Sequence, residues 1–350
     1  MRKFLIRAAV ITAIVAIALP VALFAGGAKE GQGGAMAAGG AAKYAIVFKN
    51  TGNPYGDRQM GGFKAGIEEQ GFQAILRAPD QPTAEAQIQI LEQLISQKVA
   101  AICIVGNDKD ALQPVLTKAM GQGIKVFSLD SGVNPQSRTT HVNQADSEKI
   151  GTTLIEAAYD MSGGSGDIAI LSATSQATNQ NLWIDFMKKT LAQPKYAKLN
   201  LVKIAYGDDI RDKSVSEAEG LLQSFPNLKV IIAPTTVGIA AAGKVLTDKG
   251  LGGKVFLTGL GLPSEMATYI ENGVCPYMFL WNPIDVGYLG AYTATALVSG
   301  KITGKVGEKF TAGRLGEKVI TQAPDGGTEV LLGPPFKFDK NNIEDWKKVY

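Results

Sequence analysis

The sequence has little of what most enzyme and metal sites require. It contains one histidine, His141, and two cysteines, Cys103 and Cys275, in 350 residues. A Ser-His-Asp triad or a multi-histidine metal site would have to rely on that single imidazole. The phosphate-binding pattern GxxxxGK[ST] and the zinc pattern HExxH do not occur in it. These absences count against an enzyme, and we expect no cofactor, no metal and a solvated or hinge-supporting His141.

Two local patterns look like chemical sites but have simpler interpretations. The run Ser162–Gly166 is rich in glycine, yet it precedes a predicted strand, whereas a phosphate-binding loop follows one. Asp208 and Asp209 form an acidic pair that could hold calcium or transfer protons. Because charged residues follow this pair directly, we predict a solvated loop that caps the next helix.

The two cysteines are far apart and lie in apolar surroundings. Cys103 is inside the apolar run 100–105, and Cys275 neighbours a strand-like segment. Free cysteines are among the residues most often buried in proteins. We therefore expect two separate buried thiols, although a disulfide is the alternative in an exported protein.

The N-terminus has the pattern of an export signal. Three basic residues within the first seven positions precede an uncharged, mostly apolar run from Ala8 to Ala25, and small residues follow. A retained membrane anchor is the alternative, since the run approaches the length of a membrane span. Pro20 and the small residues after it favour cleavage of residues 1–25. No cysteine lies near this boundary, so a lipid anchor is not supported.

Removal of the signal changes the charge balance. The whole chain has 35 basic and 32 acidic residues, and the signal takes three basic residues with it, which leaves 32 of each. A formally neutral protein gives no indication of nucleic-acid binding. The following stretch, 26–42, is rich in glycine and alanine and lacks bulky apolar residues, so we predict a flexible tether.

From Lys43 onward, short apolar runs alternate with helical patterns. This alternation is typical of βαβ units and parallel sheets. The strand candidates are 44–48, 72–76, 101–105, 126–129, 168–171, 201–204, 230–233, 255–258 and 278–280, and the clearest helical patterns are 57–70, 83–97 and 286–298. The pattern restarts after the polar segment 141–146. Because about 308 residues favour two domains over one, we predict two similar α/β lobes with parallel-rich sheets. The glycine- and proline-containing tail, 311–350, is expected to be mostly irregular.

Polar residues gather where the predicted strands end. The residues just after a strand, or one short turn beyond it, are Lys49, Asn107, Asp130, Asn179, Gln180, Thr235 and Asn282. Ligands of parallel α/β sheets bind outside the carboxyl ends of the strands, so this pattern indicates a site for a small polar ligand. A carboxylate such as Asp130 can accept hydrogen bonds from two hydroxyls, and the amides of Asn179 and Gln180 both donate and accept. Tyr55, Trp183 and Trp281 could cover sugar carbons or simply pack in the core.

Several phrases of the sequence resemble a known family. The short segments are Asn53–Tyr55, Leu129–Gly132 and Ala177–Asn181, and the longer ones are IIAPTTVGIAAA (231–242), TGLGLPSEM (258–266) and LWNPIDVGY (280–288). The short segments resemble type I, ribose-binding-like periplasmic sugar-binding proteins. The longer ones resemble the rhamnose-binding components of bacterial ABC importers, which are related to autoinducer-2 receptors. The resemblance runs from Lys43 to the end of the chain.

The resemblance implies two Rossmann-like lobes, joined by three crossovers, that close around one sugar. The implied N-terminal lobe comprises 43–144 and about 282–308, and the implied C-terminal lobe comprises 145–281 and about 309–350. Residues that match pocket positions of the subgroup are Lys49, Asp130, Asn179, Gln180, Pro234, Thr236 and Asn282. The full predicted site adds Tyr55, Asn107, Trp183, Thr235, Gly261 and Trp281.

Three of these positions bear on which sugar is bound. Autoinducer-2 receptors resemble this chain but carry aspartate in place of Asn179 and Asn282, and alanine in place of Thr236. Fewer carboxylates and a changed volume favour a deoxyhexose. The resemblance therefore implies an exported, monomeric, non-enzymatic receptor that binds L-rhamnose and delivers it to a membrane permease.

Two alternatives remain at this point. A receptor for autoinducer-2 or another monosaccharide would differ only in its pocket. An enzyme or a transcriptional regulator on a related fold is less consistent with an export signal, with the missing catalytic set and with the absence of DNA-binding helices.

Overall fold

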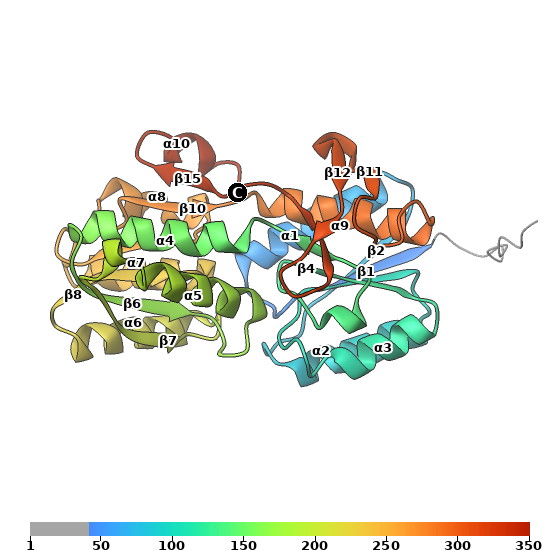
Figure 1. Cartoon of the computed structure of the whole chain (residues 1–350), viewed down its shortest axis with the longest axis horizontal. Coiled ribbons are helices and arrows are strands. Elements are labelled where there is room, and N and C mark those ends of the chain that lie inside the picture. The colour runs from blue at the N-terminus through green and yellow to red at the C-terminus, as the bar shows by residue number, and fades with distance from the viewer. Residues whose placement is uncertain (1–41) are drawn as a thin grey trace, which may run out of the picture. The chain divides into compact units, whose positions relative to one another are not determined.

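The computed structural model describes residues 42–350, and the predicted export signal and nearly all of the predicted tether lie outside this range. The described chain is built on two separate parallel-rich sheets, one in each of two lobes (Figure 1). Within residues 42–350, no helix is long and apolar enough to cross a membrane.

Seven strands form the sheet of the first lobe. Their order is β13-β14-β5-β4-β3-β1-β2, and every neighbouring pair is parallel except β13 and β14. The bounds are β1 (Lys43–Val47), β2 (Gln73–Arg77), β3 (Ala101–Ile104), β4 (Lys125–Leu129), β5 (His141–Asn143), β13 (Thr321–Gln322) and β14 (Thr328–Leu331). The helices of this lobe are α1 (Pro54–Glu68), α2 (Ala84–Ser96), α3 (Gln113–Gly121) and α9 (Pro283–Val298), with a 3₁₀ turn at Pro135–Ser137.

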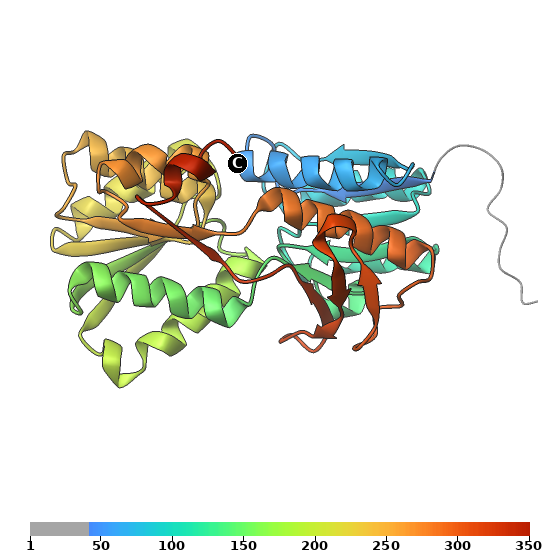
Figure 2. The same cartoon turned by 90° about the horizontal axis from the view of Figure 1, so that it is seen from above.

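Both faces of this sheet are covered, which is why its strands are apolar almost throughout. In β1, Tyr44 and Ile46 belong to the core beneath α1 and α9, whereas Ala45 and Val47 pack with α2 and α3. Successive side chains of a strand point to opposite faces, so a strand between two helical layers needs apolar residues at every position. Figure 2 shows α1 and α9 side by side on one face.

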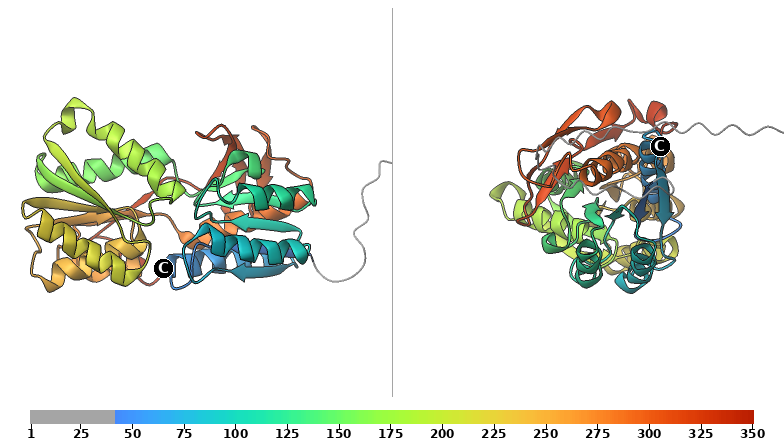
Figure 3. Two further views of the ribbon diagram at one scale, coloured as in Figure 1. Left: turned by 90° about the horizontal axis from the view of Figure 1, so that it is seen from below. Right: turned by 90° about the vertical axis from the view of Figure 1, so that its right-hand side faces the viewer.

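The second lobe contains a four-stranded, all-parallel sheet in the order β7-β6-β8-β9. Its elements are β6 (Gly166–Ser172), β7 (Leu199–Tyr206), β8 (Leu228–Ala233), β9 (Phe256–Gly259), α4 (Ser147–Ser162), α5 (Thr178–Leu191), α6 (Arg211–Ser224), α7 (Thr236–Asp248) and α8 (Pro263–Glu271), with a 3₁₀ turn at Pro194–Tyr196. Helices α4 and α5 cover one face and α6 and α7 the other (Figures 2 and 3). The predicted α/β class with two parallel-rich lobes is confirmed.

The chain passes between the lobes three times. It leaves the first sheet after β5, returns at α9, and crosses again between β14 and β15 (Phe336–Asp339). Strand β15 pairs antiparallel with β10 (Tyr277–Leu280), and α10 (Ile343–Trp346) packs against α8. The expected three-crossover hinge is thus present.

The prediction for the C-terminal tail was wrong in two respects. The tail is not mostly irregular, since it contains the hairpin β11 (Lys309–Thr311) and β12 (Glu317–Val319), a 3₁₀ turn at Gly313–Leu315, and strands β13 to β15. Nor does all of 309–350 belong to the second lobe, because β14 pairs with β5 in the first sheet. A short strand such as β14, whose partner β5 is about 190 residues away, carries no local signal, and the glycines and prolines only mark the turns between the tail strands.

Both cysteines are buried and unbonded, as expected. Cys103 lies in β3 of the first lobe, and Cys275 precedes β10. Burial raises the pKa of both thiols above the ordinary value. The prediction of two separate buried thiols is confirmed.

Candidate ligand-binding site

One cavity, called the inner cavity below, lies where the carboxyl ends of strands from both lobes meet. It contains about 410 Å³ of space not filled by protein atoms, part of it open to solvent. The residues that line it are Phe48, Lys49, Asn53, Tyr55, Val105, Asp130, Asn179, Gln180, Trp183, Asp209, Pro234, Thr235, Thr236, Leu260, Leu280 and Trp281. Most of them lie within three residues of the carboxyl end of a strand, as ligand sites of parallel sheets do.

Asp130 is the polar centre on the first-lobe side. It follows β4, and Tyr55 and Gln59 from α1 both donate to its Oδ2, the Gln59 amide at 3.1 Å. Trp281 donates from Nε1 to the Tyr55 hydroxyl at 2.7 Å. Burial and the neighbouring Asp130 carboxylate raise the pKa of Tyr55 well above its ordinary value, so the phenol is a donor at neutral pH. The result is a carboxylate held in a fixed orientation at the cavity wall.

The second lobe reaches this carboxylate through Asn179, the second residue of α5. Its Nδ2 donates to Asp130 Oδ1 at 2.8 Å, and its Oδ1 accepts from Lys49 Nζ at 3.2 Å. Lys49 and Asp130 belong to the first lobe, so one neutral amide bridges a cation and an anion across the cleft. The amide thus acts both as a hydrogen-bond donor and as an acceptor. A carboxylate at position 179 could only accept.

Asp209 supplies a second carboxylate from the second lobe, beyond the end of β7. Thr235 donates its hydroxyl to Asp209 Oδ1. Burial raises the pKa of Asp209, while the nearby Lys49 ammonium and the Thr235 hydroxyl oppose that shift. The inner cavity is therefore lined by two carboxylates and one ammonium, together with neutral hydrogen-bonding groups.

Aromatic rings cover the cavity between these polar groups. The rings of Trp183 and Trp281 meet edge to face, with centroids 5.9 Å apart and an interplanar angle of 61°. Both rings line the inner cavity, as does Tyr55. Such faces are suited to the C–H surfaces of a sugar, whose hydroxyl edges would face the carboxylates and amides.

Ten of the thirteen predicted site residues line this one cavity: Lys49, Tyr55, Asp130, Asn179, Gln180, Trp183, Pro234, Thr235, Thr236 and Trp281. Gln180 is held in place because its carbonyl oxygen accepts from Ser172 Oγ at 2.6 Å and from the Ala173 amide at 2.7 Å.

The other three predicted residues lie outside the cavity. Asn107 donates to the backbone oxygen of Lys49 at 2.8 Å and thereby supports the cavity wall from behind. Asn282 caps α9, because its Oδ1 accepts from the Ile284 amide at 3.0 Å. Gly261 is buried against Met278. Their positions after strands predicted the correct edge of the sheet but not the direction of each side chain. Asn282 therefore no longer supports the selectivity argument.

Sequence reasoning also missed lining residues, above all Asp209. We predicted a solvated loop for the Asp208–Asp209 pair, and this is wrong for Asp209; only Asp208 forms a surface ion pair, with Lys213. The other missed lining residues are Phe48, Asn53, Val105, Leu260 and Leu280. A signal existed, because Asp209 follows a strand like the residues we did select. Gln59 supports the site from one helical turn beyond Tyr55 and was equally detectable.

His141 is neither solvated nor part of the inner cavity. It is the first residue of β5, it is 8% exposed, and its Nδ1 lies 2.8 Å from Ser128 Oγ. Burial, and secondarily the charge of Arg138, lower its pKa to about 3. Within residues 42–350 no three metal-ligating side chains come together.

The sequence profile of a family described as periplasmic binding protein domain matches residues 44–302. Among characterised proteins, the chain is 25% identical over 248 residues to the D-ribose/D-allose-binding protein of Pseudomonas aeruginosa, covering 66% of this chain and 74% of that protein.

Solved structures show the same relationship. An ABC transporter solute-binding protein from Clostridium phytofermentas, with bound L-rhamnose, is 53% identical at a TM-score of 0.87 and covers 89% of this chain and 99% of that one. LsrB from Clostridium saccharobutylicum, in complex with AI-2, shares the fold at a TM-score of 0.81 and 23% identity, covering 87% of this chain and 99% of that one.

Proposed function

Because the chain belongs to the periplasmic binding protein family, whose members bind solutes and do not convert them, we propose that it is the L-rhamnose receptor of a bacterial ABC importer. The observation that carries the sugar assignment is the 53% identical solute-binding protein with bound L-rhamnose, aligned over 99% of its length. In this proposal the sugar lies in the inner cavity and the closed protein delivers it to the membrane permease. The inner cavity is complete within one chain, which supports a monomeric receptor.

The hydrogen-bonding groups of the cavity suit a neutral polyol. Asp130 accepts, Lys49 donates, and Asn179 does both; these groups bond one another across the cleft and can exchange those bonds for sugar hydroxyls. The tryptophan pair covers an apolar patch where the methyl group of a deoxyhexose is worth about 0.8 kcal/mol on burial. The methyl group tunes selectivity, and the hydroxyl contacts set the affinity.

Autoinducer-2 is the second candidate, but the chain gives it less support. A carboxylate in place of Asn179 would stand 2.8 Å from Asp130 Oδ1 and would repel it. The relative that binds AI-2 is 23% identical, which indicates a shared fold only.

We further propose that residues 1–25 are an export signal removed in the mature periplasmic protein. The basic start and the apolar run from Ala8 to Ala25 support this. Mass spectrometry of the natively produced protein should find an N-terminus between about Gly26 and Lys29. A membrane-inserted form that retains residues 1–25 would contradict it.

Calorimetry with a sugar panel tests the ligand. We expect tight binding of L-rhamnose, and weak or no binding of ribose, glucose and autoinducer-2. At a free concentration 100 times its dissociation constant, the preferred sugar should add about 2.7 kcal/mol to the free energy of unfolding. Binding of autoinducer-2 without any response to rhamnose would overturn the sugar assignment and leave the receptor class intact.

The variant Asn179→Asp tests the proposed selectivity. It removes the donor to Asp130 and adds a second anion, so we expect rhamnose affinity to fall by about 10- to 150-fold, the effect of losing one charge-assisted hydrogen bond. Asn341→Asp, at an exposed tail position, is the matched control and should bind like the wild type. Equal affinities for the two variants would remove Asn179 from the site.

A further inference from the structure

A second cavity, called the hinge chamber below, adjoins the inner cavity. Asp130, Asn179 and Trp183 line both, so these side chains lie between the two spaces. The hinge chamber contains about 580 Å³ of space not filled by protein atoms, against about 410 Å³ in the inner cavity. Part of each volume is open to solvent, and the hinge chamber is the larger of the two spaces.

Polar atoms with no protein partner are concentrated at this chamber. Gln144, which is 0% exposed and lies on the first crossover, has no hydrogen bond at either amide atom, and Trp183 Nε1, Thr178 Oγ1 and Arg138 Nε are likewise unpaired within the described chain. Buried polar groups in native proteins almost always have a partner. Four residues around one chamber therefore have donors and an acceptor whose hydrogen-bonding capacity no protein group satisfies.

The charged and titratable groups around the chamber are already occupied. Arg138 forms an ion pair with Asp325 at 2.7 Å, and Glu329 accepts from Asn143 Nδ2 at 2.9 Å. The His141 ring is engaged by Ser128 at 2.8 Å. What remains free is mostly neutral: the Gln144 amide, the Thr178 hydroxyl and an indole N–H. This set matches hydroxyl groups better than it matches an ion.

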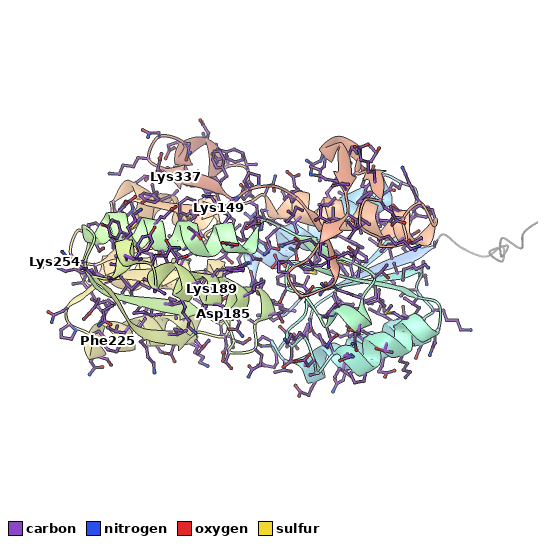
Figure 4. All side chains as sticks on the ribbon, in the orientation of Figure 1. Lys149, Asp185, Lys189, Phe225, Lys254 and Lys337 are labelled. Atoms are coloured by element: carbon purple, nitrogen blue, oxygen red, sulfur yellow. The ribbon has the colours of Figure 1, made fainter. Side chains whose placement is uncertain are left out.

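The chamber also leads outward. Thr178, Leu182 and Asp325 line both the chamber and a groove at the surface, which continues to Asp185 on α5 (Figure 4). The three spaces follow one another from the inner cavity to the surface. A ligand longer than one sugar can lie along this path, with Leu182 and Trp183 as apolar faces for its second unit.

We propose that the hinge chamber binds the second unit of an extended ligand, a neutral sugar joined through a glycosidic bond to the deoxyhexose in the inner cavity. This rests on the proposed function and deepens it: the natural ligands of the receptor include rhamnosyl disaccharides as well as the free sugar.

Calorimetry with L-rhamnose and with a disaccharide of two α-linked L-rhamnose units tests this. The wild-type protein should bind the disaccharide at least as tightly as the monosaccharide. Gln144→Leu should weaken disaccharide binding about tenfold, the order expected for one or two lost hydrogen bonds, and change rhamnose affinity by less than about twofold. Binding of rhamnose with rejection of the disaccharide would overturn the inference and leave the proposed function standing. Failure to bind either sugar would overturn both.

Two further variants keep the test decisive. Gln223→Leu, at an exposed position of α6, makes the same change far from the chamber and should leave both affinities unaltered. Thr178→Val removes the unpaired hydroxyl of the chamber without changing side-chain size. It replaces Gln144→Leu if that variant does not fold. An equal loss of affinity for both sugars in the chamber variants would contradict a separate second subsite.

Discussion

At the scale of residues, the two carboxylates of the inner cavity share an unusual backbone conformation. Asp130 has φ of 61° and Asp209 has φ of 55°. Residues other than glycine seldom adopt this left-handed region, and such strain persists where the surrounding structure imposes it. Tyr55 and Gln59 hold the Asp130 carboxylate, and Thr235 holds that of Asp209. In both cases the turn after a strand directs an acceptor into the cavity.

His141 gives a residue-scale prediction about pH. Its folded-state pKa of about 3 lies below the ordinary 6.5, so the unfolded chain takes up a proton first as the pH falls. The associated stability is fully present above pH 6.5 and is lost progressively towards pH 3. Between pH 7 and pH 5, protonation of this single group in the unfolded chain should lower the free energy of unfolding by about 2 kcal/mol.

Denaturant unfolding of the wild type and of His141→Asn should be measured at pH 7 and at pH 5. The change in unfolding free energy of the variant is subtracted from that of the wild type, so the contributions of the carboxylates common to both proteins cancel. Because the chain has one histidine, its ring resonances in an NMR titration are unambiguous. They should not move between pH 7 and pH 5. A titration midpoint near 6.5 would show that the imidazole is accessible to solvent.

At the scale of elements, the first lobe depends on the close approach of α1 and α9. A Cβ added to Gly62 would lie 2.0 Å from the backbone oxygen of Ile284, and one added to Gly287 would lie 1.8 Å from that of Gln59. Neither contact can be relieved by a side-chain rotation, because the obstacles are backbone atoms. The two glycines thus set the distance between these helices, and α1 carries Tyr55 and Gln59 to the site.

Gly62→Ala should destabilise the protein by about 1–3 kcal/mol, the usual cost of overpacking. The neighbouring Gly61→Ala is a matched control, since its Cβ would meet no atom within 4 Å. In the same helix that change should stabilise by about 0.5–1 kcal/mol, because alanine favours helix more than glycine does. Chemical denaturation of both variants measures whether each substitution raises or lowers the free energy of unfolding. If both substitutions stabilised the protein equally, α1 and α9 would not pack as described.

At the scale of the whole molecule, the cross-lobe hydrogen bonds link ligand binding to lobe closure. Lys49 and Asp130 reach Asn179 only when the lobes are together, and Arg58 of α1 reaches Ser264 of α8 at 3.3 Å in the same arrangement. A ligand that contacts both lobes binds the closed arrangement more tightly than the open one. This difference in affinity sets how far the ligand shifts the population towards the closed arrangement.

Small-angle scattering tests this coupling. Addition of L-rhamnose should reduce the radius of gyration of the wild type, and Asn179→Ala should reduce the size of that change, because a cross-lobe partner is missing. The exposed Asn341→Ala is the control and should behave like the wild type. Calorimetric binding without any change in scattering would separate sugar binding from lobe closure.

Much of this organisation could be predicted from local patterns in the sequence. Alternating strand and helix patterns determined the two α/β lobes, since periodicity reflects which faces are covered. The positions just after strands, such as Asp130 and Thr235, were recognisable because parallel strands end at a common edge. The burial of Cys103 followed from its apolar run in the same way.

Only the tertiary structure decided which strand-end side chains point into the cavity. Asp209 turns inward, whereas Asn107 and Asn282 turn to backbone groups, and the local pattern of all three is alike. Side-chain direction depends on the turn geometry and on partners from distant elements. The same reason explains β14, whose place beside β5 arises from hydrogen bonds between segments about 190 residues apart that no local periodicity records.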